Sequence, residues 1–261
     1  MRRVDTTTKS HPSAIEVHHD GETYAVHLRR LATARRFILR VRSATCDAVL
    51  TIPRRAALKD ATDFAARNAA WIGARLRRLP QVVPFEDGAR VPVRGRLTRI
   101  RHVPEARGVA WLDEEDGESC LFVAGADAHL GRRVRDFLRD LCRRDLQNAV
   151  AKYTQMIGRP TPAATLRDTT SRWGSCSSAG ALNFSWRLIM APPHVLDYLA
   201  AHEVCHLVHM NHSEKFWALC RSICPATDCA EAWLTAHGVS LHRYGAAART
   251  PTHTPQDIAA R

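Results

Sequence analysis

The chain has 261 residues, of which 45% are hydrophobic and 25% are charged, as is typical of a folded globular protein. This composition excludes a disordered chain, a collagen-like repeat and a small disulfide-stapled module. Basic residues exceed acidic ones by 12, which favours an anionic partner such as nucleic acid, a nucleotide or a membrane surface. The alternative is a general preference for arginine, because 34 of the 38 basic residues are arginine. The excess is greatest in residues 1–150, which carry a net charge of +9.

The sequence lacks the patterns of a membrane or secreted protein. No segment has the roughly 20 consecutive apolar residues of a membrane-spanning helix, so we expect no membrane partner. No apolar segment follows Arg2 and Arg3, as it would in a secretory signal. The eight cysteines have no regular spacing, which favours free thiols and a cytoplasmic protein. Cys220, Cys224 and Cys229 form a cluster that packing on a helix explains better than a second metal site.

The first half of the chain shows the patterns of short strands. Residues 1–13 lack periodicity and are expected to form a flexible tail. Alternating or β-branched runs predict strands at residues 15–19, 23–28, 37–42, 48–52, 90–93, 97–100 and 120–123. Apolar residues three and four apart predict one helix over 56–79, and the acidic residues 113–118 read as a solvated loop. Together these elements predict a mostly antiparallel, β-rich domain with helices over residues 14–128.

The second half favours helices, so the whole chain is expected to have an α+β fold. An apolar stripe predicts a long helix over about 130–157, decorated with arginines and aspartates that suit a solvated face. Two strands are expected around Gly180, and helices over 193–209, 213–224 and 228–237. These elements define a predicted catalytic domain at residues 129–244. The Ala-, Thr- and Pro-rich residues 245–261 are expected to be disordered.

The chemistry is indicated by the sequence His202-Glu203-Val204-Cys205-His206, an HExxH pattern. Residues four apart on a helix point the same way, so the two imidazoles can bind one zinc ion. Glu203 follows the first ligand and is placed to act as general base toward water at the metal. The apolar residues around the pattern suit a helix that is buried on most sides.

A third ligand is required, and His212 is the best candidate. It lies six residues after His206, which on a straight helix would carry it about 9 Å along the axis. The chain must therefore turn back, and Asn211 is a residue that tolerates the left-handed conformation. His209 and Glu231 are alternatives, although His209 lies beyond the reach of a metal between His202 and His206.

Segments on both sides of this pattern resemble the YgjP-like metal-dependent hydrolases, which are related to the WLM and SprT zinc proteases. The similarity is most specific over 165–220 and is carried by residues 171–177, 183–193, 197–198, 202–206, 210–213 and 216–217. The resemblance implies a small zincin-like metallopeptidase domain with an HExxH helix and an adjacent β-hairpin. It also implies zinc at His202, His206 and His212, with Glu203 catalytic. One small departure is that Phe184-Ser185 stands where the resemblance leads us to expect a more polar, Asn-bearing stretch.

The segment before the histidine helix supplies candidate substrate-binding residues. An edge strand beside the helix would pair with an extended substrate, and Arg172, Trp173 and Ser175 are candidates to contact it. Arg172 would hold an anionic group or stabilise an oxyanion, and Trp173 would cap the pocket. The alternatives are an ion pair for Arg172 and core packing for Trp173. Gly174 would permit close backbone approach, and Cys176 is expected to pack rather than to react.

Three functions fit these observations. The first is a zinc-dependent hydrolase acting on peptides, because HExxH enzymes are mostly metallopeptidases. The second, implied by the resemblance, is a pyrophosphohydrolase of nucleoside triphosphates such as UTP that uses the same metal site. The third is a nucleic-acid-associated zinc protein whose positive charge localises it, although the sequence carries no recognisable nucleic-acid-reading motif.

Overall fold

The computed structural model describes residues 12–42, 47–79 and 81–245. Its contacts divide the chain between residues 80 and 81 into two compact units, whose described parts are 12–79 and 81–245. Both units combine helices and strands, which confirms the α+β class. The domain boundary predicted between residues 128 and 129 falls inside the second unit. Residues 1–11 and 246–261 of the two predicted tails lie outside the described residues.

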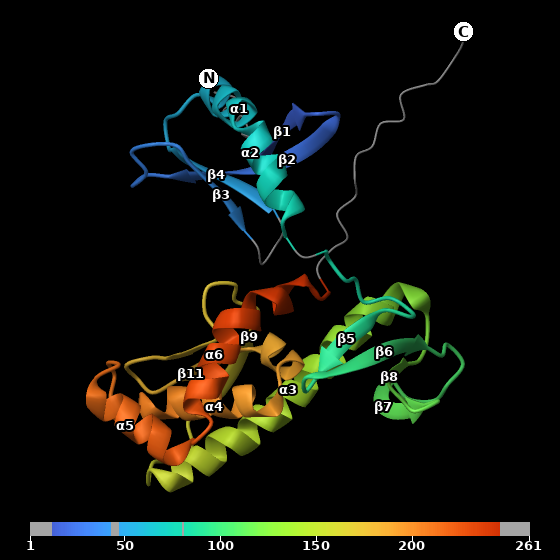
Figure 1. The fold of residues 1–261 in the computed structure, drawn as a ribbon, viewed down its shortest axis with the longest axis vertical. Helices are drawn as coiled ribbons and strands as arrows, with labels where there is room; N and C mark the ends of the chain where they lie inside the picture. The colour runs from blue at the N-terminus through green and yellow to red at the C-terminus, as the bar shows by residue number, and fades with distance from the viewer. Residues whose placement is uncertain (1–11, 43–46, 80, 246–261) are drawn as a thin grey trace, which may run out of the picture. The chain divides into compact units, whose positions relative to one another are not determined.

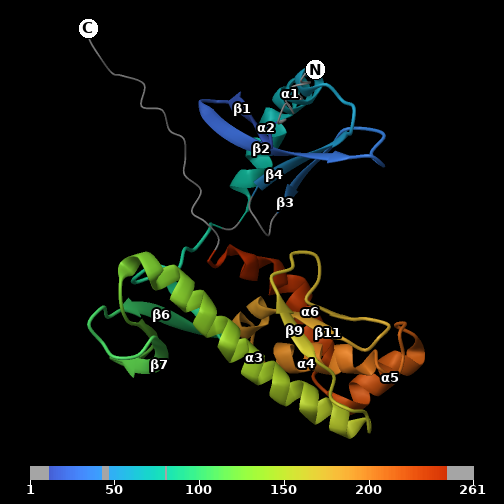
Figure 2. The same ribbon diagram turned by 180° about the vertical axis from the view of Figure 1, so that it is seen from behind.

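The first unit is a four-stranded sheet covered on one face by two helices (Figures 1 and 2). The strand order is β1-β2-β4-β3, in which β2 and β4 are parallel and the other two pairs are antiparallel. The elements are β1 (Ala14–His19), β2 (Glu22–Leu31), β3 (Ile38–Arg42), β4 (Asp47–Pro53), α1 (Leu58–Arg67) and α2 (Ala69–Arg77).

Alternation along the strands places the core of this unit. In β4, Ala48, Leu50 and Ile52 are fully buried while their neighbours are not, because successive side chains of a strand point to opposite faces. The buried face meets Ala61, Ala65 and Ile72 of the two helices, among others.

The single helix predicted over 56–79 is wrong, since α1 and α2 are separated at Asn68. The Asn68 side-chain amide donates a hydrogen bond of 2.8 Å to the carbonyl of Phe64. Asparagine side chains compete in this way for backbone partners and so favour helix ends.

The second unit contains two sheets and four helices in the described residues, with short 3-10 helices between them. One sheet has the order β5-β6-β8-β7 and the other has the order β10-β11-β9. The strands are β5 (Arg90–Val93), β6 (Arg96–His102), β7 (Ala110–Glu115), β8 (Glu118–Val123), β9 (Ala164–Arg167), β10 (Gly174–Cys176) and β11 (Leu182–Ser185). The helical elements are η1 (Asp127–His129), α3 (Leu130–Met156), η2 (Trp186–Met190), α4 (Pro193–Cys205), α5 (Glu214–Ile223), α6 (Thr227–His237) and η3 (Gly238–Arg243).

The prediction of a solvated loop at the acidic segment 113–118 is wrong. This segment forms the end of β7, a turn and the start of β8. Asp116 and Gly117, with φ of 52° and 76°, form the turn between the two strands. Glu115 accepts hydrogen bonds from Arg99 and Arg101 of β6. The Glu115 carboxylate is therefore neutralised across the sheet, which periodicity within the segment does not reveal.

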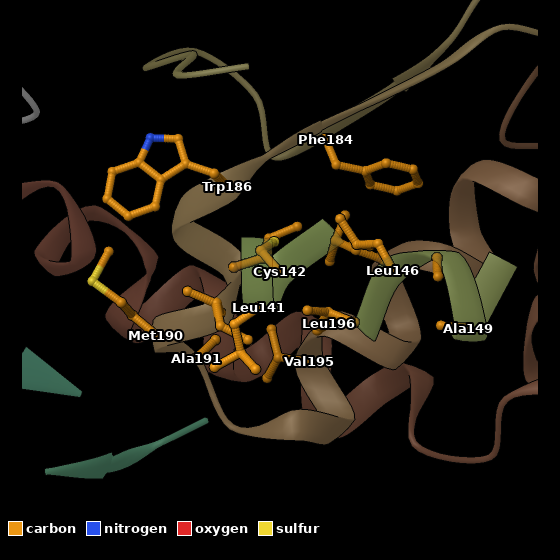
Figure 3. Packing of buried hydrophobic residues seen from close by; sticks show 14 of the residues in the cluster. Leu141, Cys142, Leu146, Ala149, Phe184, Trp186, Met190, Ala191, Val195 and Leu196 are labelled. Atoms are coloured by element: carbon orange, nitrogen blue, oxygen red, sulfur yellow. The ribbon is translucent and has the colours of Figure 1, made fainter. Parts of the chain in front are cut away.

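The long helix α3 packs against several other elements of the second unit. Its apolar side contacts η2 and α4. Figure 3 shows Leu141, Cys142, Leu146 and Ala149 of α3 in the cluster that also contains Phe184, Trp186, Met190, Ala191, Val195 and Leu196. This packing fixes α4, the helix that carries the histidine motif. No helix among the described residues is long and apolar enough to span a membrane.

A buried arginine anchors the C-terminal η3 beside this core. Arg187 is 7% exposed and donates hydrogen bonds to both carboxylate oxygens of Asp168, at 2.8 and 3.3 Å. Its remaining nitrogen donates to the carbonyls of Leu241 and Tyr244. Burial alone would raise the pKa of the Asp168 carboxyl, but the hydrogen bonds and charge of Arg187 lower it. The pair thus satisfies a charge that would otherwise be costly to bury.

Acid is expected to destabilise this anchor through His242, which is 4% exposed. Burial and the charge of Arg187 lower the pKa of His242 from 6.5 to about 4. The unfolded chain therefore binds more protons between these two pH values, so stability is lost as pH falls from 6.5 to 4. The loss reaches about 3 kcal/mol.

Urea unfolding at several pH values, with chelator present to remove metal effects, measures this loss. The His242→Gln variant should show a flatter dependence between pH 6.5 and 4. An equally steep dependence in the variant would assign the loss to other groups.

Candidate metal centre

The C-terminal end of α4 positions the first half of the candidate site. Pro193 begins the helix, where its missing N–H is not needed. His202 and Glu203 lie in the last turn of α4, and His206 is its C-cap residue. The helix ends at Cys205, four residues before the helix end predicted at residue 209. The two histidines still lie one turn apart, with ring centroids separated by 5.1 Å.

The chain then reverses and brings a third histidine back. A turn over residues 206–208 follows the helix, and the amide of His209 donates to the carbonyl of Cys205 at 2.9 Å. Asn211, which tolerates the left-handed conformation, does not adopt it, since its φ is not positive. Ser213 caps α5 by accepting a hydrogen bond from the amide of Phe216, which holds the adjacent His212 in place.

Three imidazoles converge at this point. The candidate ligand atoms of His202, His206 and His212 all lie within 4.8 Å of one another. The Nε2 atoms of His202 and His212 are 3.0 Å apart. Two nitrogens bound tetrahedrally to one zinc ion at 2.0–2.1 Å would lie about 3.3 Å apart, so this spacing suits a shared metal ion.

The other ring nitrogens have partners that orient these imidazoles. Nδ1 of His206 lies 3.0 Å from the carbonyl oxygen of His209, and Nδ1 of His202 lies 3.2 Å from the Tyr198 hydroxyl. A proton held on Nδ1 leaves the lone pair on Nε2 free for a metal. Phe216 is fully buried and lies within 5 Å of all three imidazole rings, so it forms an apolar support.

The electrostatics favour neutral imidazoles. Burial, together with the charges of neighbouring histidines, lowers the pKa of His206 and of His212. Both rings are therefore neutral near pH 7, which is the form that binds metals. The donor set, its outer hydrogen bonds and its protonation state all fit a divalent metal ion.

Glu203 lies beside this cluster as a buried carboxylate that is 4% exposed. Burial raises the pKa of Glu203 to about 7, although the charges of His202 and Arg172 oppose the shift. Its Oε2 atom is buried without a hydrogen-bond partner among the described residues. Because an unpaired buried carboxylate oxygen is costly, this atom is a natural acceptor for a water or substrate proton.

The strand β10 passes directly over Glu203. A Cβ atom on Gly174 would lie 2.3 Å from Oε1 of Glu203 and 2.8 Å from its Cδ, so any larger residue here must displace the Glu203 side chain. The approach that we predicted for Gly174 is thus an approach to the candidate catalytic carboxylate. The charge of Glu203 also contributes to the raised pKa of Cys176, after burial. Gly174 and Cys176 therefore face α4.

The Gly174→Ala variant is expected to slow turnover about 100-fold, because the added methyl group must displace Glu203. A shift of about 1 Å in a catalytic group costs this much. The metal content should stay the same, since no histidine is touched. Steady-state kinetics and metal analysis measure the two effects. Ser178→Ala, in the exposed turn of the same hairpin, is the matched control; wild-type kinetics in Gly174→Ala would contradict the role of this contact.

The other predicted substrate-binding residues lie around β10. Arg172 is exposed and acts electrostatically on Glu203. Trp173 packs against His242, at 5.1 Å between ring centroids, and against Gly238. Ser175 alternates with Gly174 and Cys176, so its side chain points to the other face of the sheet. The structure thus brings Arg172 near the site and places Trp173 against η3.

Several residues considered from the sequence stay outside the cluster. Glu231 and the side chain of His209 are not part of the one converging metal-ligand group found among the described residues. The charge of Glu231 contributes to the raised pKa of Tyr198 and opposes the lowering of the pKa of His212. Cys220 and Cys224 are buried and Cys229 is exposed, and they form no such group.

Phe216 and Trp217 pack against His212. The role of Tyr198, whose hydroxyl orients His202, was not predicted from the sequence. Tyr198 lies four residues before His202 on the same helix face, and this spacing is the signal that identifies it.

Converging imidazoles beside a buried carboxylate are the parts of a metal-dependent hydrolase. Residues 35–237 match the family model described as YgjP-like, metallopeptidase domain, and the chain therefore belongs to the YgjP-like family. Membership of a metallopeptidase family implies a metal cofactor and a peptide substrate. No curated protein and no solved structure matches the chain.

Proposed function

We propose that the protein is a zinc metallopeptidase with a zincin-like catalytic domain. The observation that carries this proposal is the convergence of His202, His206 and His212 next to the buried carboxylate of Glu203. Three imidazoles are a ligand set that zinc favours in catalytic sites, which keep an open fourth position. When bound, zinc supplies a Lewis acid that polarises a carbonyl and lowers the pKa of water.

Glu203 acts as the proton carrier of the reaction. Its carboxylate accepts a proton from the water that attacks the peptide carbonyl. It then gives this proton to the leaving amine nitrogen as the C–N bond breaks. A pKa of about 7 suits both steps near neutral pH, because the group is then an adequate base and an adequate acid.

The strand β10 holds the substrate in an extended conformation. It is an edge strand, since β11 is its only partner in the described sheet. A peptide that pairs with the free edge would lie alongside Glu203, with main-chain hydrogen bonds supplying affinity. Arg172, at the start of this segment, would bind an anionic group of the substrate. Ser175 would contribute through its backbone, and Trp173 would support the segment from behind.

A substrate screen on the purified chain tests this function. We expect about one zinc ion per chain by mass spectrometry of the metal content, and cleavage products from a peptide library. A chelator should abolish cleavage and added zinc should restore it. A parallel panel of nucleoside triphosphates, with zinc or magnesium, tests the alternative reaction. Pyrophosphate release without peptide cleavage would contradict the peptidase proposal and favour a nucleotide hydrolase.

A further inference from the structure

The positive charge of the chain is divided unequally between the two units. Residues 12–79 carry a net charge of +7, whereas the much longer segment 81–245 carries only +2. The excess therefore belongs mainly to the small unit that lacks the histidine site. A general preference for arginine explains the choice of arginine over lysine, but it does not explain this division.

The arginines of the two units also differ in their partners. In the second unit, many form ion pairs with carboxylates, among them Arg90, Arg94, Arg96, Arg99, Arg101, Arg132, Arg143, Arg187 and Arg221. Within residues 12–42 and 47–79, Arg42 is the only arginine with an ion pair, which it makes to Asp47. The charge of the first unit is thus exposed rather than neutralised internally.

An aromatic hollow lies on the same unit at the edge formed by β3. Its volume is about 410 Å³, and it is lined by residues 36–39 and by Phe64, Asn68 and Trp71. Phe37 and Phe64 pack edge to face at 5.4 Å. Trp71 remains 47% exposed, although burying an indole is strongly favourable. Together with Phe37 and Phe64, this exposed ring offers an aromatic surface to a partner.

Exposed arginines occur in this hollow and on the two elements that border it. Arg36 lines it, Arg40 follows on β3, and Arg75 lies one helical turn after Trp71 on α2. All three side chains are exposed. In addition, β3 is an edge strand whose outer backbone groups have no strand partner in the described sheet. Cations and an aromatic ring therefore occur together along one open edge.

We propose that this surface, formed by Arg36, Phe37, Arg40, Phe64, Trp71 and Arg75, binds single-stranded nucleic acid. Arginine forks match phosphate oxygens, and an exposed indole stacks on a nucleobase, which is the combination used for unpaired strands. A duplex keeps its bases stacked inside, and an acidic peptide has no flat rings to cover Trp71. The proposal concerns a partner and is independent of the reaction at the histidine site.

Fluorescence anisotropy of the full chain with a labelled 20-nucleotide single strand tests the proposal. Binding should weaken with salt, and Arg36→Gln combined with Arg40→Gln should reduce the slope of log K against log salt by about 1.4. Trp71→Ala should weaken binding about tenfold with little change in slope, and Trp71→Phe should restore part of it. Thermal unfolding verifies that each variant is folded.

The matched control is Arg132→Gln combined with Arg143→Gln, which removes the same charge from exposed ion pairs on α3. This control should bind like the wild type. Equal losses in the control and in the Arg36/Arg40 variant would show a non-specific charge effect and overturn the proposal. So would unchanged binding in Trp71→Ala, or tighter binding to a duplex, to polyglutamate or to phosphatidylserine vesicles.

Discussion

The Glu203→Gln variant is expected to keep its metal and its fold yet to cleave peptides about a thousand times more slowly. Glutamine has nearly the same shape as glutamate, so the packing under Gly174 is preserved. It cannot accept a proton from water, and a general base contributes between 100-fold and 10,000-fold. Because the ligand set of three histidines is intact, metal affinity should change little.

Three measurements separate this prediction from a loss of structure. Mass spectrometry gives the metal content, thermal unfolding gives the stability, and kcat is measured on a peptide found in the library screen. In the wild type, kcat/KM should fall on the acidic side as Glu203 becomes protonated. In the variant this acidic limb should be absent. Turnover close to that of the wild type would exclude Glu203 as the base and direct attention to another group.

Replacing His212 by alanine should lower zinc affinity at least 100-fold and remove activity with it. His212 contributes one of three converging imidazoles, and even the loss of an outer hydrogen-bond partner of a ligand costs 10-fold to 100-fold in affinity. Competition with a zinc-chelating dye measures the affinity. Excess zinc should restore part of the activity, since the other two ligands and Glu203 remain.

His209→Ala and Glu231→Gln are the matched controls for this substitution. His209 orients His206 through its backbone carbonyl, which alanine retains, and its side chain lies outside the ligand group. Glu231 influences the pKa of His212 through its charge and is not one of the converging ligands. Both variants should bind zinc nearly as the wild type does. Strong loss of zinc in Glu231→Gln, with normal binding in His212→Ala, would reassign the third ligand.

The local part of the site can be predicted from sequence spacing. His202 and His206 are four residues apart, and a helix places such residues on one face whatever surrounds it. The return of His212 can also be expected, because no straight helix could bring it back. The form of that return cannot be predicted from the spacing. The helix α4 ends early, at Cys205, so the chain turns back without a left-handed Asn211.

The remaining differences arise where a segment depends on distant partners. The acidic end of β7 looks like a solvated loop by itself, but arginines of β6 neutralise Glu115 and stabilise a strand. The break at Asn68 depends on a competition between one side chain and the backbone that an apolar period does not record. Gly174 suggests a close approach, yet only the fold shows that Glu203 is what it approaches.

The amino-acid sequence by itself determined the α+β class, the HExxH pattern, the candidate third ligand and the total charge of +12. Each of these depends on composition or on residues a few positions apart. The tertiary structure decided which carboxylate is buried under β10, which hydroxyl orients His202, and which arginines are neutralised. These properties depend on contacts between segments far apart in the chain, and such contacts form only when the segments pack.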